Sequence, residues 1–198
     1  MMENFGKKKM SICCIRRIVL FCLFVGMAVR LPAVMVKLPL SFLVEQSDVI
    51  ALGRVEDVRC EWSQDGRLIL TVVRISLQEV WQGGALPPDF HIQTPGGTIG
   101  DLTLRVSDTP DFRLGEDVCL FLQSASKTEP VLRSSTVITH LFSSYTVFGQ
   151  AQGKWSVDGE GRARRGGFEL IEPAGSEDEA VPLSVLKQRV LKEQNRIM

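Results

Sequence analysis

The side chains best suited to catalysis or metal binding are few and widely spaced. The chain has two histidines, His91 and His140, which lie 49 residues apart. A zinc site needs three or four ligands at suitable spacing. Cys60 or Cys119 could complete such a set, but histidines with a structural or surface role are the preferred interpretation. Nucleophilic catalysis needs a serine or cysteine beside a base, and no Gly-x-Ser-x-Gly motif occurs. The sequence therefore predicts no catalytic, metal or cofactor-binding site.

Two loops carry residues that resemble known ligand-binding motifs. Asp101, Asp108 and Asp111 cluster around Pro110, and such carboxylates can bind Ca²⁺ or act as an acid–base pair. Their spacing matches no calcium loop, so turn formation through side chain to backbone hydrogen bonds is the preferred interpretation. The segment Pro95-Gly96-Gly97-Thr98 differs from a phosphate-binding loop because a strand, not a helix, is predicted to follow.

A basic cluster lies near the carboxyl end. Arg162, Arg164 and Arg165 could contact an anionic lipid or a polysaccharide. The acidic run at 177–179 balances this charge, so a solvated linker is the preferred interpretation.

The amino-terminal segment has the order of a secretory signal. Residues 1–33 carry a net charge of +5, and an apolar run of 12 residues follows the basic part, from Ile18 to Val29. A membrane-spanning helix needs about 20 apolar residues, so a cleaved signal is favoured over an uncleaved signal anchor. Cleavage after Ala28 or Ala33 is predicted. The rest of the chain has a net charge of −5, which argues against nucleic acid as a partner.

Export affects the expected state of the cysteines. Three of them leave with the signal, and Cys60 and Cys119 remain as an even pair in an oxidising compartment. A disulfide between these two would close a loop of about 60 residues and contribute up to about 4 kcal/mol. The alternative is a pair of buried free thiols, and the sequence leaves both open.

Hydrophobic periodicity predicts the elements that must position these residues. Strands alternate apolar and polar residues, and turns are marked by Asp-Gly or Pro-Gly. The strongest signal is a hairpin of two long strands, at 47–58 and 68–80, joined by the turn Ser63-Gln64-Asp65-Gly66. Further strands are predicted at 89–94, 98–106 with a possible bulge at Gly100, 117–122 and 131–139. A final pair of strands is predicted at 145–151 and 154–157, around Gln152-Gly153, and a helix capped by Ser41 at 42–46.

These elements divide the chain into four parts. Residues 1–33 form the signal, 40–158 a β-barrel domain, 159–181 a flexible linker, and 182–195 an amphipathic helix. About seven short strands without a βαβ rhythm predict an all-β fold. We expect a small OB-like barrel, with a short amino-terminal helix and a carboxy-terminal amphipathic helix.

An ordered set of motifs resembles a family of uncharacterised exported bacterial proteins. The match covers about residues 40–158. It consists of Ser47-Asp48-Val49-Ile50, Gly53-Arg54-Val55, Glu79-Val80 with Gly83, Pro95-Gly96-Gly97, Phe112 with Gly115-Glu116, Leu120-Phe121-Leu122, and Gly149 with Gln152-Gly153-Lys154. More distantly, the opening resembles the netrin-like OB module of tissue inhibitors of metalloproteinases. Those inhibitors bind zinc through an amino-terminal cysteine, which has no counterpart here. The resemblance implies a fold and export, and no activity.

The expected function is therefore a class and not a reaction. We expect an exported, non-enzymatic binding or interaction module of the cell envelope (the periplasm in particular) or the extracellular space. Its expected partner is a protein or envelope component and not nucleic acid, with membrane contact only through Ile18–Val29 if the signal is uncleaved. The alternatives are a hydrolase with an unrecognised site, or a structural subunit of an envelope assembly.

Overall fold

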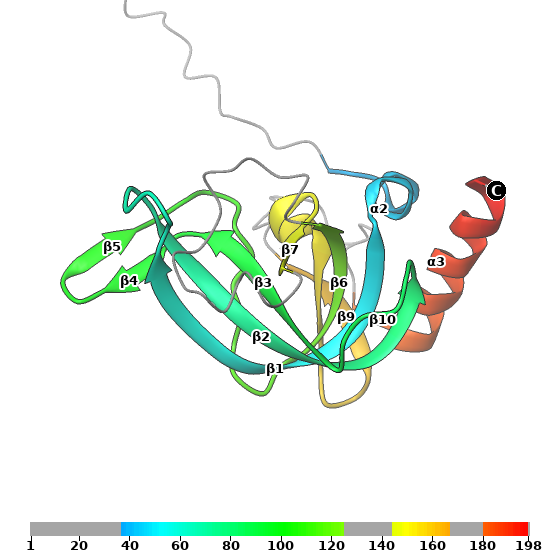
Figure 1. The fold of residues 1–198 in the computed structure, drawn as a ribbon. Helices are drawn as coiled ribbons and strands as arrows, with labels where there is room; N and C mark the ends of the chain where they lie inside the picture. Colours follow the sequence, from blue (N-terminus) through cyan, green and yellow to red (C-terminus); the bar gives the residue numbers. More distant parts are fainter. Residues whose placement is uncertain (1–36, 125–143, 167–179, 198) are drawn as a thin grey trace, which may run out of the picture. The chain divides into compact units, whose positions relative to one another are not determined.

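A closed barrel of five strands forms the centre of the molecule (Figure 1). The structure is a computed structural model that describes residues 37–124, 144–166 and 180–197. The barrel strands are β1 (Val49–Trp62), β2 (Ile69–Gln82), β3 (Asp89–Pro95), β6 (Asp117–Ser124) and β7 (Ser144–Val147). The sheet runs β1-β2-β3-β7-β6 and closes through pairing of β6 with β1. This confirms the predicted all-β fold with a small OB-like barrel.

The long β1–β2 hairpin bends because its register is interrupted. Irregularities fall between Ile50 and Ala51, between Leu52 and Gly53, and between Val55 and Asp57. At Gly53 an added Cβ would lie 2.4 Å from Cγ2 of Ile75, so only glycine allows the two strands to approach this closely. The bends let β1 pair with β2 on one edge and with β6 on the other.

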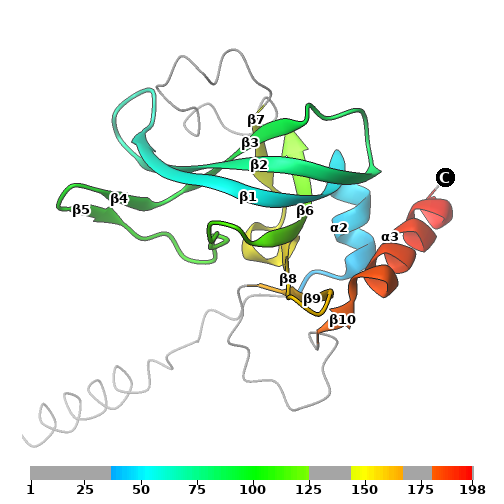
Figure 2. The same cartoon turned by 90° about the horizontal axis from the view of Figure 1, so that it is seen from below.

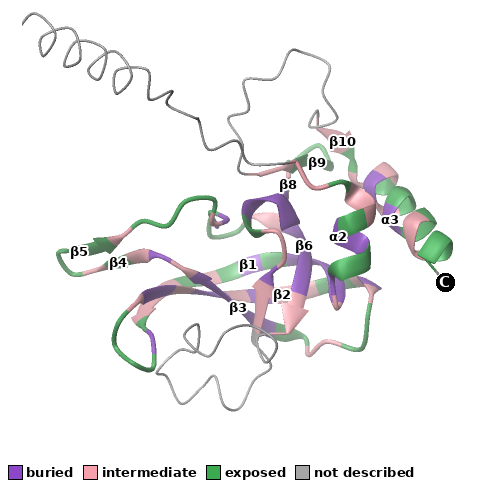
Figure 3. Cartoon of the chain, turned by 90° about the horizontal axis from the view of Figure 1, so that it is seen from above, coloured by how far each residue is buried: buried purple, intermediate pink, exposed green. Residues whose placement is uncertain are grey.

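Strand β6 contributes to two hydrophobic cores because its side chains alternate. Val118, Leu120 and Leu122 belong to the core inside the barrel. Cys119 and Phe121 belong to a second core outside it, shared with the helices α2 (Leu40–Gln46) and α3 (Leu183–Ile197). Figure 3 shows buried residues on β6, α2 and α3. The prediction that 117–122 is a central strand is confirmed.

Three further strands extend the sheet beyond the barrel. Strand β8 (Lys154–Val157) pairs with β6, β9 (Arg162–Arg165) with β8, and β10 (Val181–Pro182) with β9. Helix α3 follows β10 directly and buries Leu186 and Val190. Within the described residues, no helix combines the length and apolar character needed to cross a membrane.

Two predicted elements in the first half of the chain need correction. The segment 98–106 is a small hairpin and not one strand: β4 (Gly97–Ile99) pairs with β5 (Leu102–Leu104), and Gly100 turns the chain with a φ of 58° instead of forming a bulge. Helix α2 begins after Pro39, so Ser41 lies inside it and does not cap it.

Two predictions in the second half are also wrong. Strands β7 and β8 do not pair with each other but run in succession along the same edge of β6, interrupted by the 3-10 turn η3 (Gln150–Gly153). Residues 162–165 form β9 and therefore do not belong to a linker. The predicted strand at 131–139 and the acidic part of the predicted linker lie outside the described residues, as does the signal.

The hairpin β4–β5 and helix α3 lie on opposite sides of the barrel (Figures 1 and 2). Each covers a different end of the β1–β2 hairpin, β4 near Cys60 and Thr71 and α3 near Trp81. A pocket accompanies each of them.

Candidate functional site

A pocket of about 460 Å³ lies at the mouth of the barrel, under the β4–β5 hairpin. We call it the barrel-mouth pocket. Val58 and Cys60 of β1, Thr71 of β2 and Thr94 of β3 line its barrel side. These residues continue the inward-facing rows of the first core, because Val58 pairs with Val73 and Thr94 with Thr71. Phe112 belongs both to that core and to the lining, so it closes the pocket towards the barrel interior.

Threonine hydroxyls dominate the polar lining. Most of them already donate or share a hydrogen bond within the fold. Thr71 Oγ1 donates to the carbonyl of Gly96 at 2.8 Å, and Thr109 Oγ1 donates to the carbonyl of Val106 at 3.0 Å. The hydroxyls of Thr98 and Thr103 face each other across the hairpin at 3.0 Å. Because a hydroxyl has one proton and two lone pairs, these groups keep acceptor capacity towards the pocket.

Thr94 differs from the other threonines. Only 5% of Thr94 is exposed, and no hydrogen bond joins its hydroxyl to another described residue. The hydroxyl oxygen is not among the fully enclosed, unpartnered polar atoms of the described residues, so it can be reached from the pocket. Since Thr94 lines the pocket, its hydroxyl is available to a ligand or to water there.

Gly97 allows the hairpin to pack directly on the pocket wall. An added Cβ would lie 2.5 Å from Cys60 Sγ and 2.9 Å from Thr71 Oγ1, and the φ of Gly97 is 130°. Both values exclude a larger residue without rearrangement. Cys60 Sγ and Thr71 Oγ1 are 3.7 Å apart, which places a half-buried thiol in the wall of the pocket.

One cation and one anion line the outer part of the pocket. Arg105 follows β5, and Asp111 precedes Phe112; both are exposed. The loop that carries them is held by the barrel: Ala151 N–H donates to the carbonyl of Asp108 at 2.8 Å. Lys154 Nζ donates to the carbonyl of Asp111. The position of the loop over the barrel mouth is therefore fixed by hydrogen bonds.

Lys154 and Glu116 form the charged support below this loop. Nζ of Lys154 is 2.9 Å from both carboxylate oxygens of Glu116 and 5.0 Å from the centre of the Phe112 ring. Burial acts to raise the pKa of Glu116, but hydrogen bonds from Lys154 and Ser156 outweigh it and hold that pKa below its ordinary value. Glu116 thus keeps its negative charge at neutral pH, and the pair holds the loop at Asp111 and Phe112.

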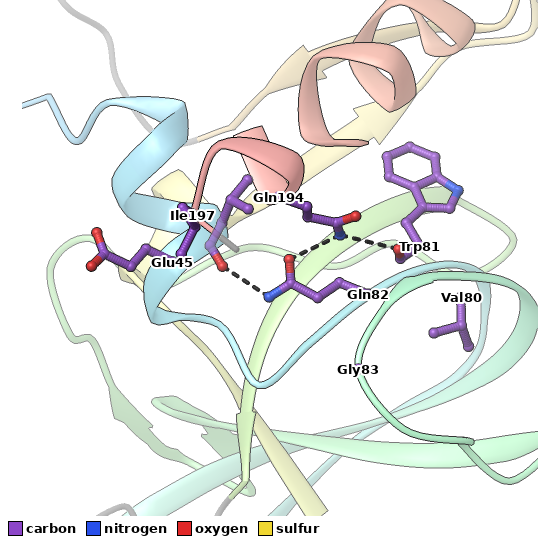
Figure 4. A pocket seen from close by; sticks show the side chains of 8 residues that line it. Glu45, Val80, Trp81, Gln82, Gly83, Gln194 and Ile197 are labelled. Atoms are coloured by element: carbon purple, nitrogen blue, oxygen red, sulfur yellow. Dashed lines mark hydrogen bonds between the residues drawn. The ribbon is translucent and has the colours of Figure 1, made fainter. Parts of the chain in front are cut away.

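A second pocket, of about 410 Å³, lies between α2, the end of β2 and α3 (Figure 4). Its amide groups are used by the fold. Gln194 Nε2 donates to the carbonyl of Trp81 at 3.1 Å and to Gln82 Oε1 at 2.9 Å. Gln82 Nε2 donates to the carbonyls of Val44 and Ser47, each at 2.9 Å. These bonds join helix α3 to the barrel, so the polar groups of the second pocket have a structural role. The barrel-mouth pocket is therefore the stronger candidate for a ligand-binding site.

The predicted disulfide between Cys60 and Cys119 is not present, because both are free thiols. Cys119 pairs with Leu52, and Cys60 lies eight residues further along β1. At about 3.3 Å per residue this separation is far greater than the Cα distance of about 7 Å that a disulfide tolerates. Burial raises the pKa of the Cys119 thiol, which is fully enclosed in the second core.

The structure separates the other residues that the sequence singled out. His91 is buried on β3, where desolvation and the charges of Arg59 and Arg74 lower its pKa, and it lines neither pocket. His140 lies outside the described residues. Among the described residues, no group of three or more His, Cys, Asp and Glu side chains is placed to hold a metal ion.

The two loops and the basic cluster have structural roles. Of the three loop aspartates only Asp111 lines the pocket, while Asp101 is exposed in the β4–β5 turn. Arg162 pairs with Asp158 and Glu160, and Arg165 lies over the Trp155 ring. The segment 95–98 does line the pocket, through its backbone and Thr98.

Sequence reasoning missed the threonines that form the pocket. The alternation of Phe90, Ile92 and Thr94 could have indicated that Thr94 continues an inward-facing row.

No protein-family model matches the chain, and no curated protein matches it significantly. The resemblance to exported bacterial proteins therefore stays a prediction.

Proposed function

We propose that the protein is an exported, non-enzymatic binding module of the cell envelope or the extracellular space. The observation that carries the binding role is Thr94, which is only 5% exposed as a residue and lines an open pocket, while its hydroxyl has no partner among the described residues. Barrel mouths are a common place for small-molecule sites, and about 300–1,000 Å³ is the usual size of such a site. The barrel-mouth pocket, at about 460 Å³, falls in this range.

The chemistry of the lining favours binding over catalysis. General acid–base chemistry needs a group with a suitable pKa within hydrogen-bonding reach of the reacting atom. The pocket offers hydroxyls, one thiol, one arginine and one aspartate, and Cys60 Sγ contacts a threonine hydroxyl and not a base. These groups can orient a ligand through hydrogen bonds.

A substitution that fills the pocket tests the binding role. Thr103→Trp places a large ring in the lining, whereas Leu102→Trp places the same ring at the neighbouring position, which is 59% exposed and does not line the pocket. Native mass spectrometry after incubation with small molecules extracted from cell envelopes should show an adduct on the wild type and on Leu102→Trp, but not on Thr103→Trp. Equal adducts on both variants, or none on the wild type, would contradict the proposal.

Export is tested separately by sequencing the amino terminus of the protein recovered outside the cytoplasm. The small residues after the apolar run predict a start between Val29 and Val36. Retention of Met1 together with the membrane fraction would instead support the signal anchor.

A further inference from the structure

We infer that the ligand of the barrel-mouth pocket is a saccharide, bound as an uncharged ring with several hydroxyl groups. This inference rests on the proposed binding function and specifies its ligand class. It depends on three features of the pocket: which hydrogen-bonding roles its hydroxyls leave open, how its charges balance, and what its apolar residues can contact.

The open hydrogen-bonding roles match a ligand that both donates and accepts. Thr71 and Thr109 already use their protons within the fold, so they offer lone pairs to a ligand. Thr94 offers a proton and lone pairs, because its hydroxyl has no partner among the described residues. A carboxylate is an acceptor only and leaves the threonine lone pairs unused. A sugar hydroxyl fits because it donates and accepts at the same atom.

The charges that line the pocket favour a neutral ligand. Arg105 attracts an anion, but Asp111 lines the same pocket and repels it. For a cation the two roles are reversed. A neutral polyol can hydrogen-bond to both groups, with Arg105 as donor and Asp111 as acceptor, and suffers no repulsion from either.

The remaining lining is apolar and suits the C–H groups of a sugar ring. Val58, Leu104, Val106 and Phe112 contribute aliphatic and aromatic surface beside the hydroxyls. A sugar ring has hydroxyls at its rim and C–H groups on its faces, so the mixed lining is complementary to it. The volume of about 460 Å³ leaves room for one or two rings.

Cys60 provides a direct probe of the pocket. It lines the pocket and is half-buried, whereas Cys119 is fully buried, so we expect no labelling of Cys119 in the folded protein. We would measure the rate at which N-ethylmaleimide labels the folded full chain and subtract the rate of Cys60→Ala, which reports the amino-terminal cysteines. The probes are a panel of neutral mono- and disaccharides, including peptidoglycan and lipopolysaccharide sugars. Inorganic phosphate, acetate, trialanine and octanoate represent the other ligand classes.

A saccharide should slow Cys60 labelling in a saturable way. Thr94→Val removes one hydroxyl and should weaken this protection about five- to tenfold, the size of one hydrogen bond. It should melt no lower than the wild type, because no described residue uses that hydroxyl. Ser76→Ala removes a hydroxyl from β2 outside the pocket and should leave the protection unchanged.

The outcomes distinguish this inference from the proposed function. If saccharides protect Cys60 and Thr94→Val weakens that protection, both the saccharide inference and the binding function are supported. Protection by phosphate, acetate, trialanine or octanoate but by no saccharide overturns the saccharide inference and leaves the binding function in place. If no probe protects Cys60 and no envelope molecule forms an adduct, both are overturned.

Discussion

Lys154 is almost completely buried, yet its ammonium group is well supplied with oxygen partners. The two carboxylate oxygens of Glu116 lie 2.9 Å away, and the carbonyl of Asp111 is also bound. Removing one partner of a buried pair is costly because the other charge stays behind without compensation, typically by about 3–5 kcal/mol. An exposed pair such as Lys187 with Glu79 is worth less than about 1 kcal/mol. The buried pair and the exposed pair therefore allow a comparison of what one ion pair contributes to stability in each environment.

Glu116→Gln should lower the free energy of unfolding by about 3 kcal/mol at pH 7, and Glu79→Gln by less than about 1 kcal/mol. The pKa of Glu116 is lowered in the folded protein, so its stabilisation is complete above the unfolded value of about 4.3 and is lost as the pH falls through the folded value. Urea titrations followed by tryptophan fluorescence, repeated between pH 7 and pH 3, measure the free energy of unfolding of each protein. The difference between wild type and Glu116→Gln should shrink on acidification. A difference that stays constant over this range would mean that the ion pair does not stabilise the fold.

At the scale of elements, predictability depended on the length of each strand. The β1–β2 hairpin was found because each strand has 14 residues, which is long enough to show a strand pattern, and an Asp-Gly turn lies between them. The β4–β5 hairpin was missed because its strands have three residues each, which is too short for alternation to be recognised. A single strand through Gly100 was the simpler interpretation of the same residues.

The site could be predicted only in part, for a related reason. Periodicity shows that Thr94 faces inward, but whether its hydroxyl has a partner depends on residues that the fold brings together. Cys60 and Cys119 illustrate the same limit. Cys119 falls in the strand predicted at 117–122 and Cys60 just beyond the one predicted at 47–58, but the relative position of the two strands was not known. Pairing of β6 with the first half of β1 is a long-range contact that no local pattern encodes.

Helix α3 tests how well a helical pattern identifies buried residues. Leu186 is fully buried against the second core, whereas Leu191 is 38% exposed. Leu186→Ala should lower the free energy of unfolding by about 3 kcal/mol, because it removes buried methyl groups and leaves a cavity. Leu191→Ala, with the same change of side chain, should cost less than about 1 kcal/mol. Chemical denaturation measures both, and equal effects would show that the facing of α3 is misassigned.

For the whole molecule, the decisive feature is that one strand belongs to both cores. Leu120 faces the barrel interior, and its neighbour Phe121 faces the helices. Helix α3 is in addition joined to the end of β2 through Gln194. The barrel and the helices therefore cannot lose their packing independently, since loss of either core disrupts β6. We therefore expect the described residues from 37 onwards, which belong to one compact unit, to unfold as a single cooperative unit.

Substitutions on the two faces of β6 test this cooperativity. Leu120→Ala and Phe121→Ala should each lower stability by about 3–4 kcal/mol, since both side chains are fully buried. Each should shift one common transition, measured by far-ultraviolet circular dichroism for the sheet and by tryptophan fluorescence for the second core. Trp81 and Trp155 lie in that core, and the exposed Trp62 is replaced by phenylalanine in all proteins compared. If the cores unfolded separately, Phe121→Ala would move the fluorescence transition to lower denaturant and leave the circular dichroism transition in place. Within each protein, wild type or variant, we expect the circular dichroism and fluorescence transitions to have the same midpoint. The reason is that loss of packing on one face of β6 also disrupts the other face.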